Sequence, residues 1–312
     1  MTIVANTYLT FSAIGNREDL ADTIYNIDSV ETPFQKAIDK VKAKATLHEW
    51  QSQSLAAAAN NAQLQGDDVS FTAVTPTARL TNRTQISRKE VVIAGTQEAV
   101  DKAGRESELV YQLMLKTKEL RRDIEVVLTG NRAPVTGNST TAPQLRPLCA
   151  WYATNDNRGS GGADGTSSAA ATDAGTQRPL TEALLKGVLQ LCWAAGGSPD
   201  MIMVGPFNKT VISGFAGNAT RTIDAAKGKL VAGIDVYEGD FGTQKVVASR
   251  FSRDRDCHVL DTSLWGLATL RPMKTEDLAK TGDAEKAMVL TEYTLESRQE
   301  AGSGVVADLT TA

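Results

Sequence analysis

Residues 97–130 read QEAVDKAGRESELVYQLMLKTKELRRDIEVVLTG, and this stretch indicates the fold more strongly than any other. Apolar residues recur at helical spacing and the opposite face is charged, which is typical of an amphipathic helix. A helix over 97–129, ended by Gly130, would be about 45–50 Å long at 1.5 Å per residue. That is long for a globular protein, so we expect it to act as a structural spine. Its apolar face comprises Val100, Leu109, Val110, Leu113, Met114, Leu120, Ile124 and Val127.

The residues before this helix predict a β-hairpin over 62–95. Gly66-Asp-Asp68 is a turn signal and Thr75-Pro76-Thr77 is a second break. The flanking runs, Val69–Val74 and Leu80–Ile93, are rich in Thr, Val, Ile and Arg. A two-stranded hairpin that is polar on both faces is not stable alone. We therefore expect it to lie along another surface.

An arm of short amphipathic helices is predicted over residues 1–60. One helix lies within 17–28, and another begins at Pro33 with Thr32 as its N-cap. Helices this short bury too little apolar area to be stable alone. They must pack on their own chain or on a neighbour.

The second half of the chain alternates helices and strands. After an extended region over 130–179, whose Gly-rich part at 153–178 is expected to be a solvated surface loop, residues 180–250 predict an α/β unit. Thr181 begins a helix that ends at Gly196-Gly197, and Gly205-Pro206 begins another. The predicted strands of this unit are Met201–Val204, Ile234–Glu238 and Lys245–Ser249, the last two joined by a turn at 239–242.

Residues 257–312 predict mainly strands. The expected strands are 259–260, 265–270 and 287–297, separated by turns at Pro272 and Gly282-Asp283, with a last strand at 305–309. Alternation over 289–298 places one face in a core and the other, with Glu292, Thr294, Glu296 and Arg298, in water.

Composition narrows the class of protein. The chain has 312 residues, enough for one large domain or two smaller ones, with 41% hydrophobic and 22% charged residues. No apolar run is long enough for a membrane span and no signal peptide is evident, so we expect a cytoplasmic origin and no membrane partner. The net charge is −4 and there is no dense basic run, so any DNA nearby is contained rather than gripped.

Catalytic and metal-binding patterns are weak. The three cysteines are widely spaced without a C-x-x-C pair, so we expect reduced thiols, with Cys192 in a helical core, and no zinc site. Cys257 and His258 are adjacent on a predicted strand and point to opposite faces. We expect structural roles for His258 and His48. Phosphate-binding and calcium-loop patterns are not met, so the sequence predicts no cofactor, and an enzyme is unsupported.

Several strings, in order, resemble a known protein family. They are Arg17-Glu-Asp-Leu-Ala-Asp-Thr-Ile-Tyr-Asn-Ile27, Glu31-Thr-Pro-Phe34, His48-Glu-Trp-Gln51, Ser54-Leu-Ala-Ala-Ala-Ala59, Gly66-Asp-Asp68 and Glu292-Tyr-Thr-Leu-Glu296. Together with the order of arm, hairpin, long helix, α/β lobe and returning strands, they resemble a major capsid protein of tailed phages with the Hong Kong 97-like fold. The resemblance spans nearly the whole chain.

The resemblance implies an α+β fold with defined parts. These are an N-arm (1–60), an extended β-hairpin loop (61–96), a peripheral domain with the spine helix and a long surface loop (97–179), an α/β axial domain (180–255) and return strands of the peripheral domain (256–312). It further implies pentamers and hexamers of an icosahedral virion shell around double-stranded DNA. The hairpin would lie over the spine helix of the next subunit, and the axial loops would meet at the capsomer centre.

The resemblance also suggests partners and contact residues. It implies a portal protein, a separate scaffolding protein and a possible decoration protein. It also implies synthesis in the host cytoplasm. The initiator Met1 and the fold elements from about residue 17 favour a separate scaffolding protein over a cleaved N-terminal segment. Some members of the fold crosslink a loop lysine to a neighbour's asparagine, but residues 62–88 contain no lysine. We therefore expect no crosslinking. The predicted inter-subunit contacts are Arg17, Asp19, Arg79, Arg83, Arg88, Glu106 and Glu108.

Three alternatives differ in what the protein does. An encapsulin-type nanocompartment shell would share the fold but enclose an enzyme instead of DNA. A small α/β hydrolase or binding protein would need a convergent polar pocket, and the shortage of histidine disfavours it. A tail-tube or fibre subunit fits the long helix poorly.

Overall fold

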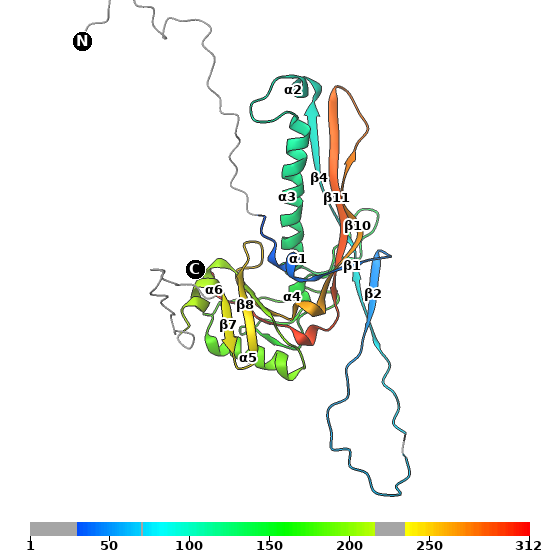
Figure 1. The fold of residues 1–312 in the computed structure, drawn as a ribbon, viewed down its shortest axis with the longest axis vertical. Coiled ribbons are helices and arrows are strands. Elements are labelled where there is room, and N and C mark those ends of the chain that lie inside the picture. The colour runs from blue at the N-terminus through cyan, green and yellow to red at the C-terminus, as the bar shows by residue number, and fades with distance from the viewer. Residues whose placement is uncertain (1–29, 70, 216–234) are drawn as a thin grey trace, which may run out of the picture.

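The computed structural model describes residues 30–69, 71–215 and 235–312. Figure 1 shows an elongated molecule with three parts: a long helix beside long strands, a lobe of shorter strands and helices, and a narrow ribbon that projects away from both. The predicted arm helix at 17–28 lies outside the described residues. Among the described helices, none is long and apolar enough to cross a membrane.

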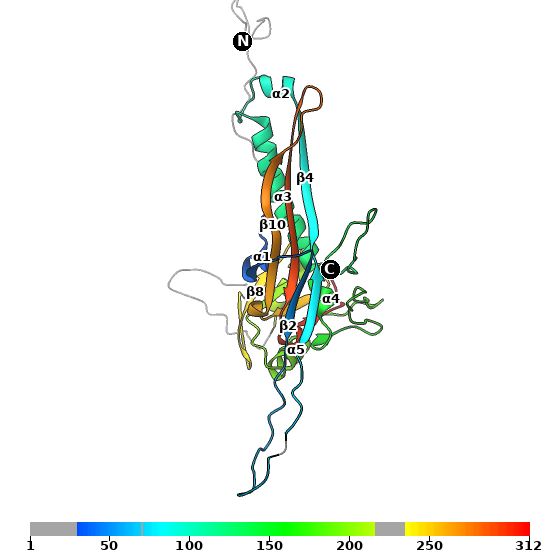
Figure 2. The ribbon, with the colours of Figure 1, turned by 90° about the vertical axis from the view of Figure 1, so that its right-hand side faces the viewer.

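The first sheet has four strands in the order β1-β10-β11-β4. They are β1 (Asp39–Lys42), β10 (Trp265–Asp277), β11 (Ala284–Ser297) and β4 (Gln85–Ala94). β1 runs parallel to β10, and the other neighbours are antiparallel. The helix α3 (Glu108–Thr129) lies along this sheet in both ribbon views (Figures 1 and 2). Its buried Leu120, Ile124 and Leu128 join the core formed with Val289 and Tyr293.

The predicted spine helix is real but shorter than expected. Residues 97–129 form two helices, α2 (Gly95–Ala99) and α3, because Val100 is extended and Gly104 has a φ of +73°. Ser107 then caps α3, and its hydroxyl accepts a hydrogen bond from the Val110 amide at 3.2 Å. With 22 residues, α3 is about 33 Å long.

The second sheet has six strands in the order β5-β12-β9-β6-β8-β7. Its strands are β5 (Asp156–Asn157), β12 (Gly304–Val306), β9 (Cys257–Leu260), β6 (Met201–Val204), β8 (Gly242–Ala248) and β7 (Val236–Gly239). The predicted strand at 201–204 and the turn before Gly242, whose φ is +114°, are confirmed. The boundary expected at residue 256 does not coincide with the division between the sheets, because β9 and β12 both belong to the six-stranded sheet.

Helices α5 (Glu182–Ala194) and α6 (Pro206–Ser213) begin where the sequence predicts. The Thr181 hydroxyl accepts from the Leu184 amide at 3.4 Å, and Gly196 ends α5 with a φ of +88°. As expected, Cys192 is buried in the core between α5 and the sheet, and all three cysteines are free thiols. Cys149 and Cys257 are buried as well.

The ribbon pairs different segments from those predicted. β2 (Leu47–Ser52) pairs with β3 (Ala78–Arg83), and the described residues between them, 53–69 and 71–77, form no strand. The predicted strand at 69–74 was therefore wrong. Its described residues, 69 and 71–74, are exposed, whereas Trp50 and His48 of β2 contact Ser297 and Glu296 of β11. The predicted turn is confirmed, because Gly66 has a φ of +85°.

Two further strand predictions needed correction. The run 80–93 is divided at Thr84 into β3 and β4, which pair with different partners. Pro272 lies inside β10, at a register shift between Arg271 and Lys274, because a bulge tolerates a residue without an amide donor.

The face of β11 expected in water is instead buried. Glu292, Thr294 and Glu296 are all less than 10% exposed. The base of the ribbon covers them: the Thr84 hydroxyl donates to Glu292 at 2.7 Å, and His48 contacts Glu296 at 2.9 Å. Alternation located this face correctly, but a distant segment covers its polar groups.

Two short α-helices, α1 and α4, are the remaining α-helices of the described chain. As predicted, α1 begins at Pro33 and spans Pro33–Ala37. Thr32 occupies the N-cap position without a side-chain hydrogen bond. In the region 130–179, α4 spans Leu148–Trp151. The Gly-rich loop is largely exposed but attached, since Asp308 accepts from the amides of Gly159 at 2.9 Å and Ala174 at 2.8 Å.

Candidate functional site

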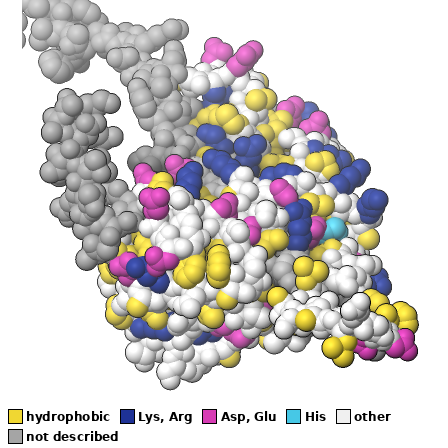
Figure 3. Space-filling model, turned by 60° about the horizontal axis from the view of Figure 1, so that its bottom comes forward, with side chains coloured by type: hydrophobic (Ala, Val, Ile, Leu, Met, Phe, Trp, Pro, Cys, Tyr) yellow, Lys and Arg dark blue, Asp and Glu magenta, His cyan; other side chains and the backbone are white. Residues whose placement is uncertain are grey.

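The ribbon differs in bounds from the predicted extended loop (61–96), because β4 belongs to the four-stranded sheet and β2 pairs with β3. We call the ribbon, residues 47–83, the extended loop; it contains the longest exposed run of the described chain. Large apolar side chains lie along its connecting segment with almost no cover from their own chain: Leu55 is 97% exposed and Phe71 is 94% exposed, and Leu64, Val69 and Val74 are similar. The loop end, at the lower right of Figure 3, also carries the exposed Asp67 and Asp68. Apolar groups at such positions indicate a surface that another molecule covers.

The base of the extended loop is fixed to the four-stranded sheet. The Trp50 indole donates to the Ser297 carbonyl at 2.7 Å. The Asn82 side-chain amide donates to the carbonyls of Leu295 at 2.7 Å and Arg146 at 3.1 Å. Asn82 is 3% exposed, so these bonds are shielded from water. A rigid base therefore supports the exposed end.

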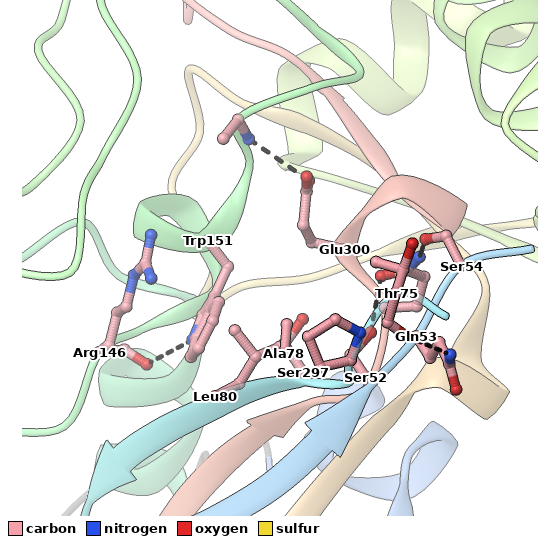
Figure 4. A pocket seen from close by; sticks show the side chains of 13 residues that line it. Ser52, Gln53, Ser54, Thr75, Ala78, Leu80, Arg146, Trp151, Ser297 and Glu300 are labelled. Carbon is pink, nitrogen blue, oxygen red and sulfur yellow. Dashed lines mark hydrogen bonds between the residues drawn. The ribbon is translucent and has the colours of Figure 1, made fainter. Parts of the chain in front are cut away.

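A groove of about 480 Å³, which we call the loop-base groove, lies where the extended loop leaves the body (Figure 4). The Arg146 guanidinium lies 4.1 Å from the centre of the Trp151 ring, a cation–π contact. Burial lowers the pKa of Arg146 to about 10, which still leaves it charged at neutral pH. The wall of the loop-base groove also contains Leu80, Ser297 and Glu300. The Glu300 carboxylate accepts a hydrogen bond from the Ala153 amide. The mixed lining suits a peptide segment better than a small reacting molecule.

A second groove of about 480 Å³, the spine groove, lies between β4 and α3. Ile86 and Val126 are exposed there at 47% and 37%. Arg88 and Arg132 make part of the wall basic, with Asp123 beside them. The complete lining is Ile86, Ser87, Arg88, Leu120, Asp123, Val126, Val127 and Arg132. The lining thus combines apolar side chains with two basic ones and one acidic one, and the end of the extended loop is apolar and acidic.

The predicted contact residues are spread over the molecule and do not form one site. Arg79 and Arg83 lie on β3, where Arg79 pairs with Glu49, and Arg88 on β4 pairs with Glu90 at 2.8 Å. Glu106 is exposed just before α3. Arg17 and Asp19 lie outside the described residues.

Glu108 differs from the other predicted contacts because it is 6% exposed. Its carboxylate contacts Arg105 and accepts from Gln112 at 2.8 Å. A neighbour would have to displace these partners to reach it.

Cys257 and His258 diverge as the strand geometry predicts. Cys257 packs in the core under α5, whereas the His258 ring stacks on Tyr152 with centroids 5.8 Å apart. Burial lowers the pKa of His258 to about 3, so the imidazole is neutral at physiological pH. Cys149 and Asp256, which are 107 residues apart in the chain, lie beside His258, and no sequence pattern indicates this contact.

Comparison with known proteins decides what this arrangement of parts belongs to. The family model of the SU10 major capsid protein matches residues 3–310. The chain belongs to this family. It is a structural capsid protein of phage virions, not an enzyme. The major capsid protein of Escherichia phage Phieco32 is 25% identical over 338 aligned residues, covering 96% of each chain.

Solved capsid structures share the fold of this capsid protein. The cyanophage A-1(L) capsid chain has a TM-score of 0.65 at 14% identity, covering 97% of this chain and 98% of that one. A chain of Microbacterium phage Oxtober96 has a TM-score of 0.63 at 12% identity, covering 94% and 96%. The fold is therefore the Hong Kong 97-like α+β capsid fold, and the capsid protein self-assembles into oligomeric shells.

Proposed function

We propose that this capsid protein forms pentamers and hexamers of an icosahedral tailed-phage head that encloses double-stranded DNA. The observation that carries the proposal is the extended loop, whose apolar end is almost uncovered by the described residues of its own chain. Burying such side chains is favourable by roughly 1.5–3 kcal/mol each. A second subunit supplies that cover in every position of a closed ring.

The proposed contact places the end of the extended loop in the spine groove of the next subunit. Phe71 and its apolar neighbours would pack on Ile86 and Val126, which are both partly exposed in the single chain. Asp67 and Asp68 would approach the basic rim at Arg88 and Arg132. Rim charges of this kind mainly set orientation and association rate, while the apolar contact supplies affinity.

The domain roles form part of the same proposal. The four-stranded sheet with α3 would form the peripheral domain and the six-stranded sheet the axial domain, with the axial loops meeting at the capsomer centre. The predicted N-arm would reach a further neighbour. Arg79 and Arg88 would contact neighbours in exchange for, or in addition to, Glu49 and Glu90. Arg83 and Glu106 would also contact neighbours. The interfaces need not be individually strong, because each ring closes through several of them.

The proposed partners follow from a shell that contains DNA. A portal protein and a separate scaffolding protein would direct assembly, and the Gly-rich loop at 153–178 is a candidate surface for a decoration protein. The net charge of −4 suits containment without tight binding. Synthesis would take place in the host cytoplasm. No lysine occurs between Lys44 and Lys89, so the extended loop cannot supply one for covalent crosslinking.

The test compares the wild-type chain with a variant carrying Leu64→Ser and Phe71→Ser. Size exclusion and negative-stain microscopy should show wild-type rings or shells far above 33.3 kDa, and the variant should remain near the size of a single chain. Because both side chains are exposed, the thermal unfolding of the single chain should not change. Thr72→Ser is the matched control. Assembly of the double variant at the wild-type yield would refute the proposed contact of the extended loop. Native particles that contain no DNA would refute the proposal of a DNA-containing phage head.

A further inference from the structure

Three potential metal ligands converge in the interior, away from the grooves. The Cys149 sulfur, an Asp256 carboxylate oxygen and a His258 ring nitrogen all lie within 4.8 Å of one another, and all three residues are buried. Cys149 lies on α4, His258 on β9, and Asp256 directly before β9. The cluster therefore joins the segment after α3 to the six-stranded sheet.

Three polar atoms of this cluster lack a partner in the described part of the chain, although the Cys149 thiol lies 3.3 Å from the Thr129 carbonyl and 3.5 Å from Asp256 Oδ2. His258 is 0% exposed, and neither ring nitrogen has a hydrogen-bond partner there; Asp256 Oδ1 is also without one. Leaving a buried polar group unpaired is unfavourable. Tyr152 stacks on the face of the imidazole, so only the ring edges, which carry the nitrogens, can receive a ligand. A ligand between these side chains would satisfy the two ring nitrogens and Asp256 Oδ1 only through their edges.

The carboxylates around this cluster outnumber the guanidinium groups that pair with them. Arg253 lies 3.0 Å from Asp256 and 2.6 Å from Asp173, and Arg255 lies 3.6 Å from Asp173 and 2.8 Å from Asp308. Three carboxylates thus share two guanidinium groups. A further guanidinium group, that of Arg158, pairs with two other carboxylates, Asp156 and Asp164, each at 2.8 Å. The network of Asp173, Asp256 and Asp308 with Arg253 and Arg255 therefore has one uncompensated negative charge. An ionised Cys149 would add a second, and a divalent cation would neutralise both.

We propose that Cys149, Asp256 and His258 bind one zinc ion, with a water molecule as the fourth ligand. Sulfur, nitrogen and oxygen donors together suit zinc, and its usual bond lengths place tetrahedral sulfur and oxygen ligands about 3.5 Å apart. Cys149 Sγ and Asp256 Oδ2 are 3.5 Å apart. Binding converts the Cys149 thiol to a thiolate and releases one proton to solvent. The ion would fasten α4 to β9 inside each subunit.

The competing occupant is a water molecule bonded to His258 and Asp256. The full chain, freed of metal with a chelator and dialysed against zinc chloride, separates the two by elemental analysis. Zinc binding predicts about one ion per chain, and Cys149→Ser and His258→Gln should each reduce this to below about one tenth. Cys192→Ser, which alters another buried thiol, should retain the ion. A wild-type content near zero, or equal content in all variants, would overturn the proposal.

A measurement on the wild type alone guards against variants that fail to fold. Cobalt added to the metal-free chain should give the near-ultraviolet charge-transfer band of a cobalt–thiolate bond, saturating near one equivalent and disappearing when zinc is added. A protein without this band binds no metal through Cys149, and the water molecule is then the occupant.

Discussion

The backbone amide of Phe34, at the start of α1, donates to the carboxylate of Glu125 on α3 at 2.7 Å. The Gln35 amide donates to the other carboxylate oxygen at 3.0 Å. Glu125 is 0% exposed, and burial raises its pKa above the ordinary value. One buried side chain on the spine helix therefore takes the place of the missing side-chain cap of α1 and fixes the start of the N-terminal segment.

Replacing Glu125 with alanine should release α1 from the spine. One buried amide and one partly buried amide would lose their acceptor, so we expect the free energy of unfolding to fall by about 1–3 kcal/mol. The amides of Phe34 and Gln35 should exchange with deuterium much faster. Glu125→Gln keeps one acceptor and should lose less. Unchanged protection in the alanine variant would show that other contacts hold α1.

Asn82→Ala should loosen the base of the extended loop. The substitution removes the donor to the carbonyls of Leu295 and Arg146 and the acceptor for the Arg146 amide at 2.8 Å. We expect a loss of about 2–3 kcal/mol in denaturant unfolding. Thr81→Ala, an exposed change on the same strand, should cost less than about 0.5 kcal/mol. Equal effects of the two changes would contradict this role for Asn82.

Asp156 should make stability depend on pH. Burial, followed by the neighbouring Asp164 carboxylate, raises the pKa of Asp156 to about 6 from an ordinary 3.8. Because the folded value is the higher one, its favourable contribution is complete below about pH 4 and is lost as pH rises through 6. Asp156→Asn should therefore be more stable than wild type at pH 7, by no more than about 1 kcal/mol after solvent screening.

The matched variant Asp164→Asn should behave in the opposite way. The contacts of Asp164 with Asp156 and Arg158 hold its pKa below the ordinary value against the effect of burial. Its contribution is therefore present above about pH 4 and lost in acid. Urea unfolding at pH 4 and pH 7 measures both. The same pH profile for the two variants would show that the carboxylates are not coupled as the geometry indicates.

Trp193→Ser should weaken assembly without weakening the single chain. Trp193 on α5 is 58% exposed, and its ring lies 5.6 Å from that of Phe241 in the turn between β7 and β8. If the axial lobe meets its neighbours, this pair supplies an aromatic contact. Particle yield in sedimentation should fall at least several-fold, while Gln190→Ser on the same helix should have no effect. Normal yield in the tryptophan variant would place the capsomer contact elsewhere.

The local patterns in the sequence predicted most elements of the axial lobe and the existence of the spine. Thr181, Gly196 and Pro206 mark helix ends through their own conformations and hydrogen bonds, so a single sequence can reveal them. The start of the spine was wrong because apolar periodicity continued past Gly104 and Ser107. Gly104 marks the break before the helix and Ser107 marks its N-cap. The predicted helix followed the apolar periodicity and ignored both residues.

The remaining features depend on contacts between distant segments. Trp50 and His48 decide that β2, not residues 69–74, pairs with β3, because both side chains contact β11. The same contacts bury Glu296, which alternation alone places in water. Cys149 and His258 likewise meet only in the folded chain. The order of the parts was predictable, while the partners of each part were not.

Cryo-electron microscopy of assembled particles tests the central claim most directly. We predict a closed shell of pentamers and hexamers in which the end of the extended loop, with Phe71, lies in the spine groove of a neighbouring subunit beside Ile86 and Val126. A shell in which that loop end faces solvent or returns to its own subunit would contradict the account, as would a chain that forms no shell.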